Sequence, residues 1–198
     1  MTTTKKNLTL ILITVLLITS LSAVFTTRAA SLPVTGAQAA PIAASAAASP
    51  AKGSLTATKV VAHGLFTYTV VQNGNSVPTG GSSVGQYAAA AKKKSIGLLA
   101  HNYLAGGSFA SLKVGQLITV TFSDGSTKTY KVYSVQTYQA TDPNDFSQPF
   151  INSNGKKVSA RTVFNAAYKA NQVTFQTCIA KNGYSSWGVL FVIAKEVP

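Results

Sequence analysis

Cysteine, histidine and acidic residues are scarce in this chain: its 198 residues include one cysteine, two histidines and four acids. The single cysteine, Cys178, excludes an intrachain disulfide framework, so packing must stabilise the fold. One thiol, two separated histidines and scattered carboxylates form no metal-ligand cluster or nucleotide motif, and we expect no cofactor. Asp142 and Asp145 alone are a thin basis for calcium, which takes about six to eight oxygen ligands.

The shortage of acids leaves the chain strongly basic. Fourteen of the 17 Lys and Arg residues and all four acids lie beyond residue 30, which gives that part a net charge of about +10. This charge confers solubility and favours an anionic envelope surface, such as wall polymers or lipid headgroups. Lys92-Lys93-Lys94 is typical of a solvated turn or helix end, and without aromatic-interleaved basic motifs we expect no nucleic-acid partner.

Residues 1–30 have the pattern of an export segment. Lys5 and Lys6 precede an apolar stretch over 8–25, and Arg28 with small residues follows. This order is that of a signal peptide, and the stretch is also about long enough for an N-terminal membrane anchor. Both interpretations place the rest of the chain outside the membrane, either anchored or secreted.

The remainder divides into a tether and one domain. Residues 31–57 are rich in Ala, Ser and Pro and cannot bury a core, so we expect a flexible tether. Residues 58–198 are enough for one packed domain. Many short alternating or β-branched runs, one hairpin signal at Asp124-Gly125 and few helical segments predict an all-β barrel or sandwich. The expected strands are 65–71, 96–100, 117–122, 127–135, 173–177 and 190–194, and the expected helices are 86–93 and 160–170.

The segment Tyr138 to Gln172 is long for a connection between strands and contains its own expected helix. Two interpretations are open: a loop that lines a binding groove, or a packed excursion that closes the barrel.

Cys178 ends a strand-like run, and the question is whether its thiol is inert or a nucleophile. Strand alternation puts Val173 and Phe175 on one face, expected to be the core, and Cys178 on the other, more polar face. A nucleophilic thiol needs a partner that helps it ionise, usually histidine. His101 also ends an apolar run, so the two side chains can converge, whereas His63 lies near the tether and is expected to be peripheral.

These residues resemble motifs of the sortase family, the exported cysteine transpeptidases of bacterial envelopes. The resemblance rests on Thr174-Phe175-Gln176-Thr177-Cys178, on Leu99-Ala100-His101 and on the strand that starts at Gly115-Gln116. It implies a closed barrel of about eight strands with one or two short helices, active as a monomer. It also implies that Cys178 cleaves a sorting peptide through a thioester that an amine or water resolves, with His101 as acid and base. Thr177 and Asn102 would bind substrate.

The chain departs from the family pattern on its last strand. In the run Trp187-Gly188-Val189-Leu190, Val189 stands where sortases carry an arginine that holds substrate and stabilises the oxyanion. Losing one such donor typically slows a reaction by about 10² to 10³. Arg161 is a candidate substitute cation, as are Lys181 and Lys195. A catalytically weak or inactive peptide-binding module is therefore the alternative to a transpeptidase, and a plain structural domain with an inert Cys178 is a third reading.

Leu32-Pro33-Val34-Thr35-Gly36 has the form of a sorting signal but lies in the tether, after the apolar segment rather than before one. It is either a coincidence of composition or a site for self-processing.

Overall fold

The computed structural model describes residues 56–198, so the expected export segment, most of the tether and Leu32–Gly36 lie outside the described residues. No helix within residues 56–198 is long and apolar enough to cross a membrane. Strand β1 (Ala57–Ala62) begins on the last residue of the expected tether. Ala57 is buried, and its N–H donates to Gln86 Oε1 at 2.9 Å. The packed domain thus starts one residue earlier than its composition indicates.

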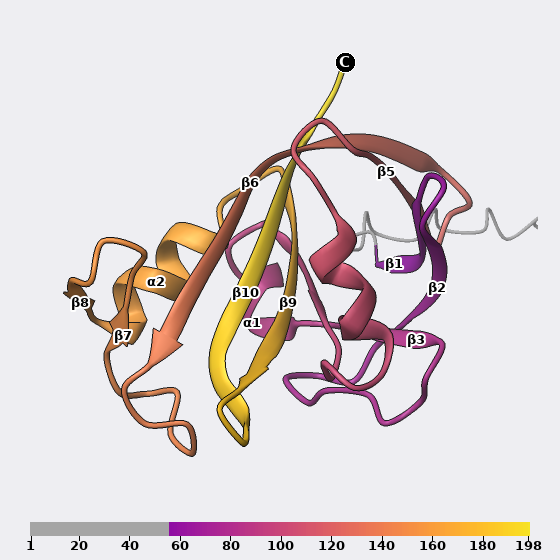
Figure 1. The fold of residues 1–198 in the computed structure, drawn as a ribbon. Helices are drawn as coiled ribbons and strands as arrows, with labels where there is room; N and C mark the ends of the chain where they lie inside the picture. Colours follow the sequence, from indigo (N-terminus) through magenta and orange to yellow (C-terminus); the bar gives the residue numbers. More distant parts are fainter. Residues whose placement is uncertain (1–55) are drawn as a thin grey trace, which may run out of the picture. The chain divides into compact units, whose positions relative to one another are not determined.

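Eight strands form a closed barrel in the order β10-β9-β4-β3-β2-β1-β5-β6, and the pairing of β10 with β6 completes the ring (Figure 1). Two pairings, β2 with β3 and β4 with β9, are parallel. The expected eight-stranded barrel is confirmed. The remaining barrel strands are β2 Phe66–Val71, β3 Ser83–Gln86, β4 Ile96–Leu99, β5 Leu117–Phe122, β6 Thr127–Ala140, β9 Gln172–Lys181 and β10 Tyr184–Glu196, and β7 Phe150–Ile151 and β8 Lys157–Val158 extend the sheet from β6.

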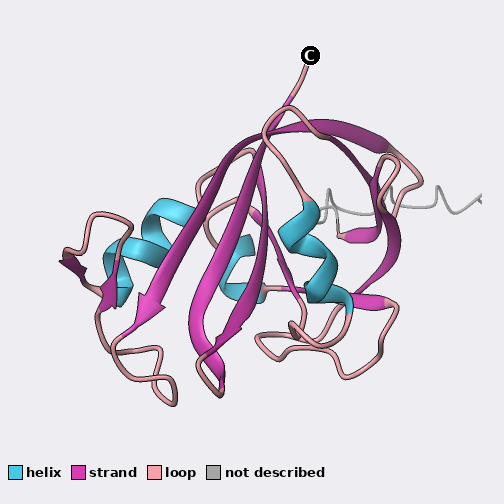
Figure 2. Ribbon diagram, in the orientation of Figure 1, coloured by secondary structure: helices cyan, strands magenta, loops and turns pink. Residues whose placement is uncertain are grey.

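Three short helical segments accompany the strands (Figure 2): α1 Ala88–Ala91, the 3₁₀ helix η1 Ala105–Ser111 and α2 Ala160–Ala167. Ser159 caps α2, because its Oγ accepts the N–H of Thr162 at 3.2 Å. Helix α1 is shorter than expected, since Gln86 belongs to β3. Strand β6 is longer than expected, since it pairs with β10 as far as Gln139.

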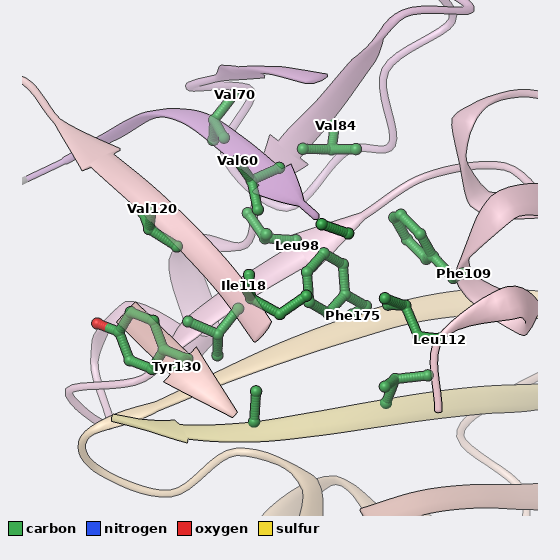
Figure 3. Close-up of a cluster of buried hydrophobic side chains, with 14 of the residues drawn as sticks. Val60, Val70, Val84, Leu98, Phe109, Leu112, Ile118, Val120, Tyr130 and Phe175 are labelled. Carbon is green, nitrogen blue, oxygen red and sulfur yellow. The ribbon is translucent and has the colours of Figure 1, made fainter. Parts of the chain in front are cut away.

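The barrel strands β9 and β10 are buried on both faces. Their inward residues join the barrel core, where Phe175 packs among Leu98, Phe109 and Val60 (Figure 3). Their outward residues join a second cluster, the outer core, which α2 and β7 complete. The outer core comprises Ala90, Ala140, Phe150, Ala160, Val163, Ala167, Tyr168, Val189, Phe191 and Ile193.

The segment from Tyr138 to Gln172 is therefore a packed excursion. It does not close the barrel, because β6 pairs directly with β10. Its helix instead covers the outer face of β9, where Thr174 Oγ1 donates to the carbonyl of Ala167 at 2.6 Å. Apolar burial on both sides of β9 and β10 explains why residues 189–194 form an uninterrupted apolar run.

Candidate active site

His101 follows the end of β4 (Ile96–Leu99), whereas Cys178 lies within β9, which continues to Lys181, so the expectation that Cys178 ends its strand is wrong. Strands β4 and β9 run parallel, and their last paired residues are Leu99 and Gln176. The next residues stay connected, because the Ala100 N–H donates to Gln176 O at 3.3 Å and Thr177 Oγ1 donates to Ala100 O at 2.8 Å. One residue further along each strand are His101 and Cys178. The register thus places the two residues at neighbouring positions of adjacent chain segments at one end of the barrel.

The two faces of β9 divide as the alternation predicts. Val173 and Phe175 point into the barrel core, whereas Thr174, Gln176 and Cys178 point outward. The outward face is not an open polar surface, however, because α2 covers its first part: Thr174 is buried, and the Tyr168 hydroxyl donates to Gln176 Oε1. Only the end of the strand emerges from this cover, and the Cys178 thiol is half-buried there.

A tight turn after His101 holds η1 against the end of β9. The carbonyl of His101 accepts the N–H groups of Leu104 and Gly106, both at 3.0 Å. A Cβ atom at Gly106 would lie 2.7 Å from the carbonyl oxygens of both Ala100 and His101 and would collide with Thr177 Oγ1. Residue 106 must therefore be glycine for η1 to pack this closely.

A depression of about 260 Å³ opens beside the thiol, and we call it the Cys178 depression. Asn102 forms part of its wall and donates from Nδ2 to the carbonyl of Ser185 at 2.9 Å, which ties the His101 loop to the β9–β10 hairpin. The residues that line the depression are Asn102, Gly106, Gly107, Ala110, Thr177, Cys178, Ile179, Ala180 and Leu190.

Thr177 and Asn102, the expected substrate-binding residues, both line the depression. The hydroxyl of Thr177 is already engaged with Ala100 O, so its observed contact positions the strand end rather than a ligand. The His101 ring is not in the lining and stacks on Tyr103, with 5.0 Å between ring centroids. Tyr103 is 72% exposed. Its contact with the imidazole was not evident from the sequence, where it reads as an ordinary loop residue.

The electrostatic environment of Cys178 disfavours its thiolate. Burial raises the pKa of the thiol above its ordinary value, and a hydrogen bond with Ser186 offsets this only in part. Within residues 56–198, no cationic side chain lines the Cys178 depression. The thiol is therefore mostly protonated at neutral pH, and a base must remove its proton before it can attack.

The three candidate substitute cations lie elsewhere. Lys181 Nζ sits 4.7 Å from the centroid of the Trp187 ring, and Lys195 Nζ sits 4.2 Å from that of Tyr133. Arg161 is exposed in the first turn of α2. None of the three lines the Cys178 depression.

Val189 is the direct ladder partner of Cys178 on β10. Its side chain points outward like the thiol, but it is fully buried in the outer core with Phe150 and Phe191. The position that the resemblance aligns with the family's arginine is thus a packed apolar site in this chain.

The acidic turn after β6 is built for local hydrogen bonds. Asp142 Oδ1 accepts the N–H of Asn144 at 2.8 Å, and Asp145 Oδ1 accepts the N–H of Ser147 at 2.9 Å. Hydrogen bonds from the Ser147 side chain, from Gln148 and from the Ser147 backbone lower the pKa of Asp145. Among residues 56–198, no group of three His, Cys, Asp or Glu side chains is arranged to hold a metal ion.

No protein-family model and no curated protein matches the chain. Among solved structures, it is similar to sortase C from Clostridium perfringens SM101, with 12% identity over 72% of this chain and 71% of the other and a TM-score of 0.47. It is similar to sortase C1 from Streptococcus suis, with 14% identity over 72% and 73% and a TM-score of 0.48. It is also similar to sortase C1 from Streptococcus agalactiae, with 17% identity over 76% and 71% and a TM-score of 0.47. These structures belong to the family that the motifs around His101 and Cys178 resemble.

Proposed function

We propose that the domain is a slow, sortase-like cysteine transpeptidase or endopeptidase of the cell envelope. The observation that carries the proposal is the register, which sets His101, just after β4, next to Cys178 on β9, beside a depression that a peptide can enter. Its substrate is a peptide or protein with a sorting motif, and its acceptor is an amine or water. The export pattern of residues 1–30 supports a location outside the membrane.

The proposed reaction has two steps. His101 takes the proton of the Cys178 thiol, and the sulfur attacks the carbonyl carbon of the scissile peptide bond. As the C–N bond breaks, His101 returns the proton to the leaving amine, and an acyl thioester remains on Cys178. An acceptor amine or a water then attacks the thioester and restores the thiol. Neither step of this reaction requires an oxidant or a cofactor.

The surroundings of Cys178 also predict a low rate of peptide cleavage. The raised pKa of Cys178 keeps the thiolate scarce, and the Cys178 depression contains no cationic donor for the oxyanion among the described residues. A missing oxyanion donor typically costs about 10² to 10³ in rate. We therefore expect turnover well below that of an enzyme with an arginine at this position.

The test combines thiol alkylation and peptide cleavage on the full chain. Replacing His101 by glutamine should abolish cleavage of a peptide library and slow alkylation of Cys178 near neutral pH, because general-base help is worth about 10² to 10⁴. His63→Gln is the matched control, since His63 bonds Thr119 and lies outside the Cys178 depression. Identical alkylation rates in both variants and the wild type, with no cleavage, would overturn the proposal.

A peptide-binding module without turnover is the second candidate, and the burial of Val189 favours it. The two functions separate with Cys178→Ser. A binding module keeps its peptide affinity in this variant and shows no cleavage in the wild type. A transpeptidase shows wild-type cleavage that the variant loses.

A further inference from the structure

Two lysines lie directly opposite each other on the outer face of the barrel, where β6 passes between β5 and β10 (Figure 1). Lys131 on β6 is the ladder partner of Lys195 on β10 and also of Leu117 on β5. Partners in an antiparallel ladder project from the same side of the sheet, so the three side chains form one row across three strands. All three are exposed, and we call them the lysine row.

No carboxylate neutralises the lysine row among residues 56–198. Glu196 follows Lys195 in the chain, but its ladder partner is Tyr130, which belongs to the barrel core, so Glu196 projects from the other side of the sheet. Its carboxylate is also bound by Lys128, whose Nζ lies 2.8 and 3.0 Å from the two oxygens. Like charges directly opposite each other destabilise a sheet, and an anionic partner would remove this cost.

Exposed apolar side chains accompany the two ammonium groups. A shallow hollow of about 510 Å³ lies beside Lys131 and Lys195, and Val114, Tyr133 and Val197 contribute to its lining. Val114 is 66% exposed, Tyr133 is 39% exposed and Leu117, within the row, is 44% exposed. The surface is therefore both basic and apolar, a combination typical of an interaction site rather than of a solvated face.

Tyr133 is held in place against the lysine row. The register between β6 and β10 shifts between Ile193 and Ala194, which leaves Tyr133 without a ladder partner, in a β-bulge. Lys195 Nζ lies 4.2 Å from the centroid of its ring, and Gln172 Nε2 donates to its hydroxyl at 3.1 Å. Tyrosine and lysine side chains that combine an apolar body with a polar tip are enriched at membrane–water interfaces.

The partner of this surface must accept positive charge and apolar side chains together. A second copy of the chain does not fit, because a two-fold contact would bring two lysine rows face to face. An acidic peptide would neutralise the lysines but would not require the exposed Val114 and Leu117. A bilayer with anionic headgroups meets both needs, since its headgroups attract lysine and its boundary region takes up apolar side chains.

We propose that the lysine row and the hollow beside it dock the domain on an anionic lipid surface. Residues 26–55, which separate the apolar stretch from the described domain, span at most about 100 Å when fully extended, so a membrane that holds this stretch is within reach. The ladder partner of Lys195 on β9 is Gln172, six residues before Cys178. Docking therefore holds the Cys178 depression roughly 20 Å from the row, at about 3.3 Å per strand residue.

Lysine acylation, followed by mass spectrometry, tests the docking on the full chain. The chain is mixed with phosphatidylcholine vesicles or with vesicles of equal parts phosphatidylcholine and phosphatidylglycerol, so any contribution of residues 8–25 is present in both. Lys131 and Lys195 should react about fivefold more slowly on the anionic vesicles, the factor for one basic residue at such a surface. Salt at about 1 M, where the screening length is about 3 Å, should restore both rates. Lys156 and Lys157 are exposed, lie outside the hollow and should react equally on both vesicles.

Three results of this experiment would overturn the proposal. One is equal acylation of Lys131 and Lys195 on the two kinds of vesicle. Another is equal slowing at Lys156 and Lys157, which would show that net charge attracts the domain without a preferred face. The third is slowing by soluble polyglutamate but not by anionic vesicles, which would assign the row to an acidic polypeptide. Acylation does not report on peptide cleavage, so this proposal and the proposed function fail separately.

Two double variants locate the charged part of the contact. The measured quantity is the ratio of the partition coefficients on anionic and neutral vesicles. Lys131→Gln/Lys195→Gln should lower this ratio about 25-fold, as expected for two lysines that each contribute about fivefold. Lys156→Gln/Lys157→Gln removes the same net charge elsewhere and should lower the ratio less than about twofold. Equal reductions in the two variants would contradict docking through the row.

Leu117→Ser tests the apolar part of the contact. It should lower the partition coefficient on anionic vesicles about threefold or more, because apolar surface that leaves water on docking is lost. Tyr184→Ser is the control, since Tyr184 is 56% exposed but lies on the β9–β10 hairpin, outside the hollow. Equal partition coefficients for the two variants would mean that no apolar side chain of the row enters the bilayer, and docking on a lipid surface would be wrong.

Discussion

Cys178 on β9 and Val189 on β10 are direct partners in an antiparallel ladder, so their side chains leave the barrel on the same side. One side chain is a half-buried thiol, and the other is a fully buried methyl pair beneath α2 and β7. The nearest cross-strand neighbour of the thiol is therefore apolar, and it contributes nothing to ionisation or to oxyanion binding.

Val189→Arg should make Cys178 more reactive and the fold less stable. A guanidinium beside the thiol favours the thiolate and lowers the pKa of Cys178 by about one unit or more. Crowding of the outer core costs about 1 to 3 kcal/mol of unfolding free energy, and burial of the unpaired charge adds to this cost. The pH dependence of alkylation and the Tm measure the two effects.

Val189→Met is the control, because it crowds the outer core without adding charge. It should lower Tm and leave the pH dependence of the Cys178 alkylation rate unchanged. If the folded arginine variant has the wild-type profile, the missing cation does not limit the thiol.

Thr177→Val should disturb the site more than its loss of stability explains. The substitution removes the bond from Thr177 Oγ1 to Ala100 O, which holds the His101 strand end beside the Cys178 strand end. Thr174→Val removes a similar buried bond, to Ala167 O, on the α2 side. Each should cost about 1 to 3 kcal/mol in denaturant unfolding. Only Thr177→Val should slow alkylation of Cys178, and equal rates in the two variants would show that the bond does not position the site.

Gly106→Ala should destabilise the domain and open the Cys178 depression. The added Cβ must displace η1, since it would lie 2.7 Å from two carbonyl oxygens. Gly81→Ala is the control, because a Cβ there meets nothing within 4 Å. We expect a lower Tm and faster access of a bulky alkylating reagent for Gly106→Ala alone. An unchanged Tm would mean that η1 packs less tightly than the geometry indicates.

Stability should fall in alkaline solution as tyrosines ionise. The pKa of Tyr130 is raised to about 12 in the folded state, whereas an unfolded tyrosine titrates near 10. The stabilising contribution of its neutral form is complete below pH of about 10 and is lost as pH rises toward 12. Tyr130→Phe should flatten this part of the unfolding profile, and Tyr184→Phe, at an exposed position, should not. If both variants lose stability equally between pH of about 10 and 12, Tyr130 is not the source of the alkaline loss of stability.

Local patterns predict six of the eight barrel strands, whereas the roles of His101 and Cys178 stay predictions. The alternation of residues 173–178 indicates the correct inward face, and the end of the apolar run 96–100 marks His101. These features depend on the alternation of buried and exposed residues along a strand, which is visible in the sequence of that strand alone. Strands β1 and β3 were missed: β1, Ala57–Ala62, borders the Ala-rich tether, and the four residues of β3, Ser83–Gln86, include a glycine and no alternation.

The cover over the outer face could not be predicted, because it depends on contacts between distant segments. Thr174 and Gln176 are polar and indicate an exposed surface, yet Ala167 O and the Tyr168 hydroxyl satisfy them beneath α2. The burial of Val189 has the same origin. Its sequence position shows only that an arginine is missing from the motif, and not that an outer core occupies its place.

Strand β10 also determines when the domain can form during synthesis. It lies between β9 and β6 in the ring and pairs with both, although it is the last strand in chain order. Until residues through Glu196 have emerged, β6 and β9 each have an unpaired edge and the outer core lacks Phe191 and Ile193. The ring of strands therefore cannot close until β10 has left a ribosome or translocation channel.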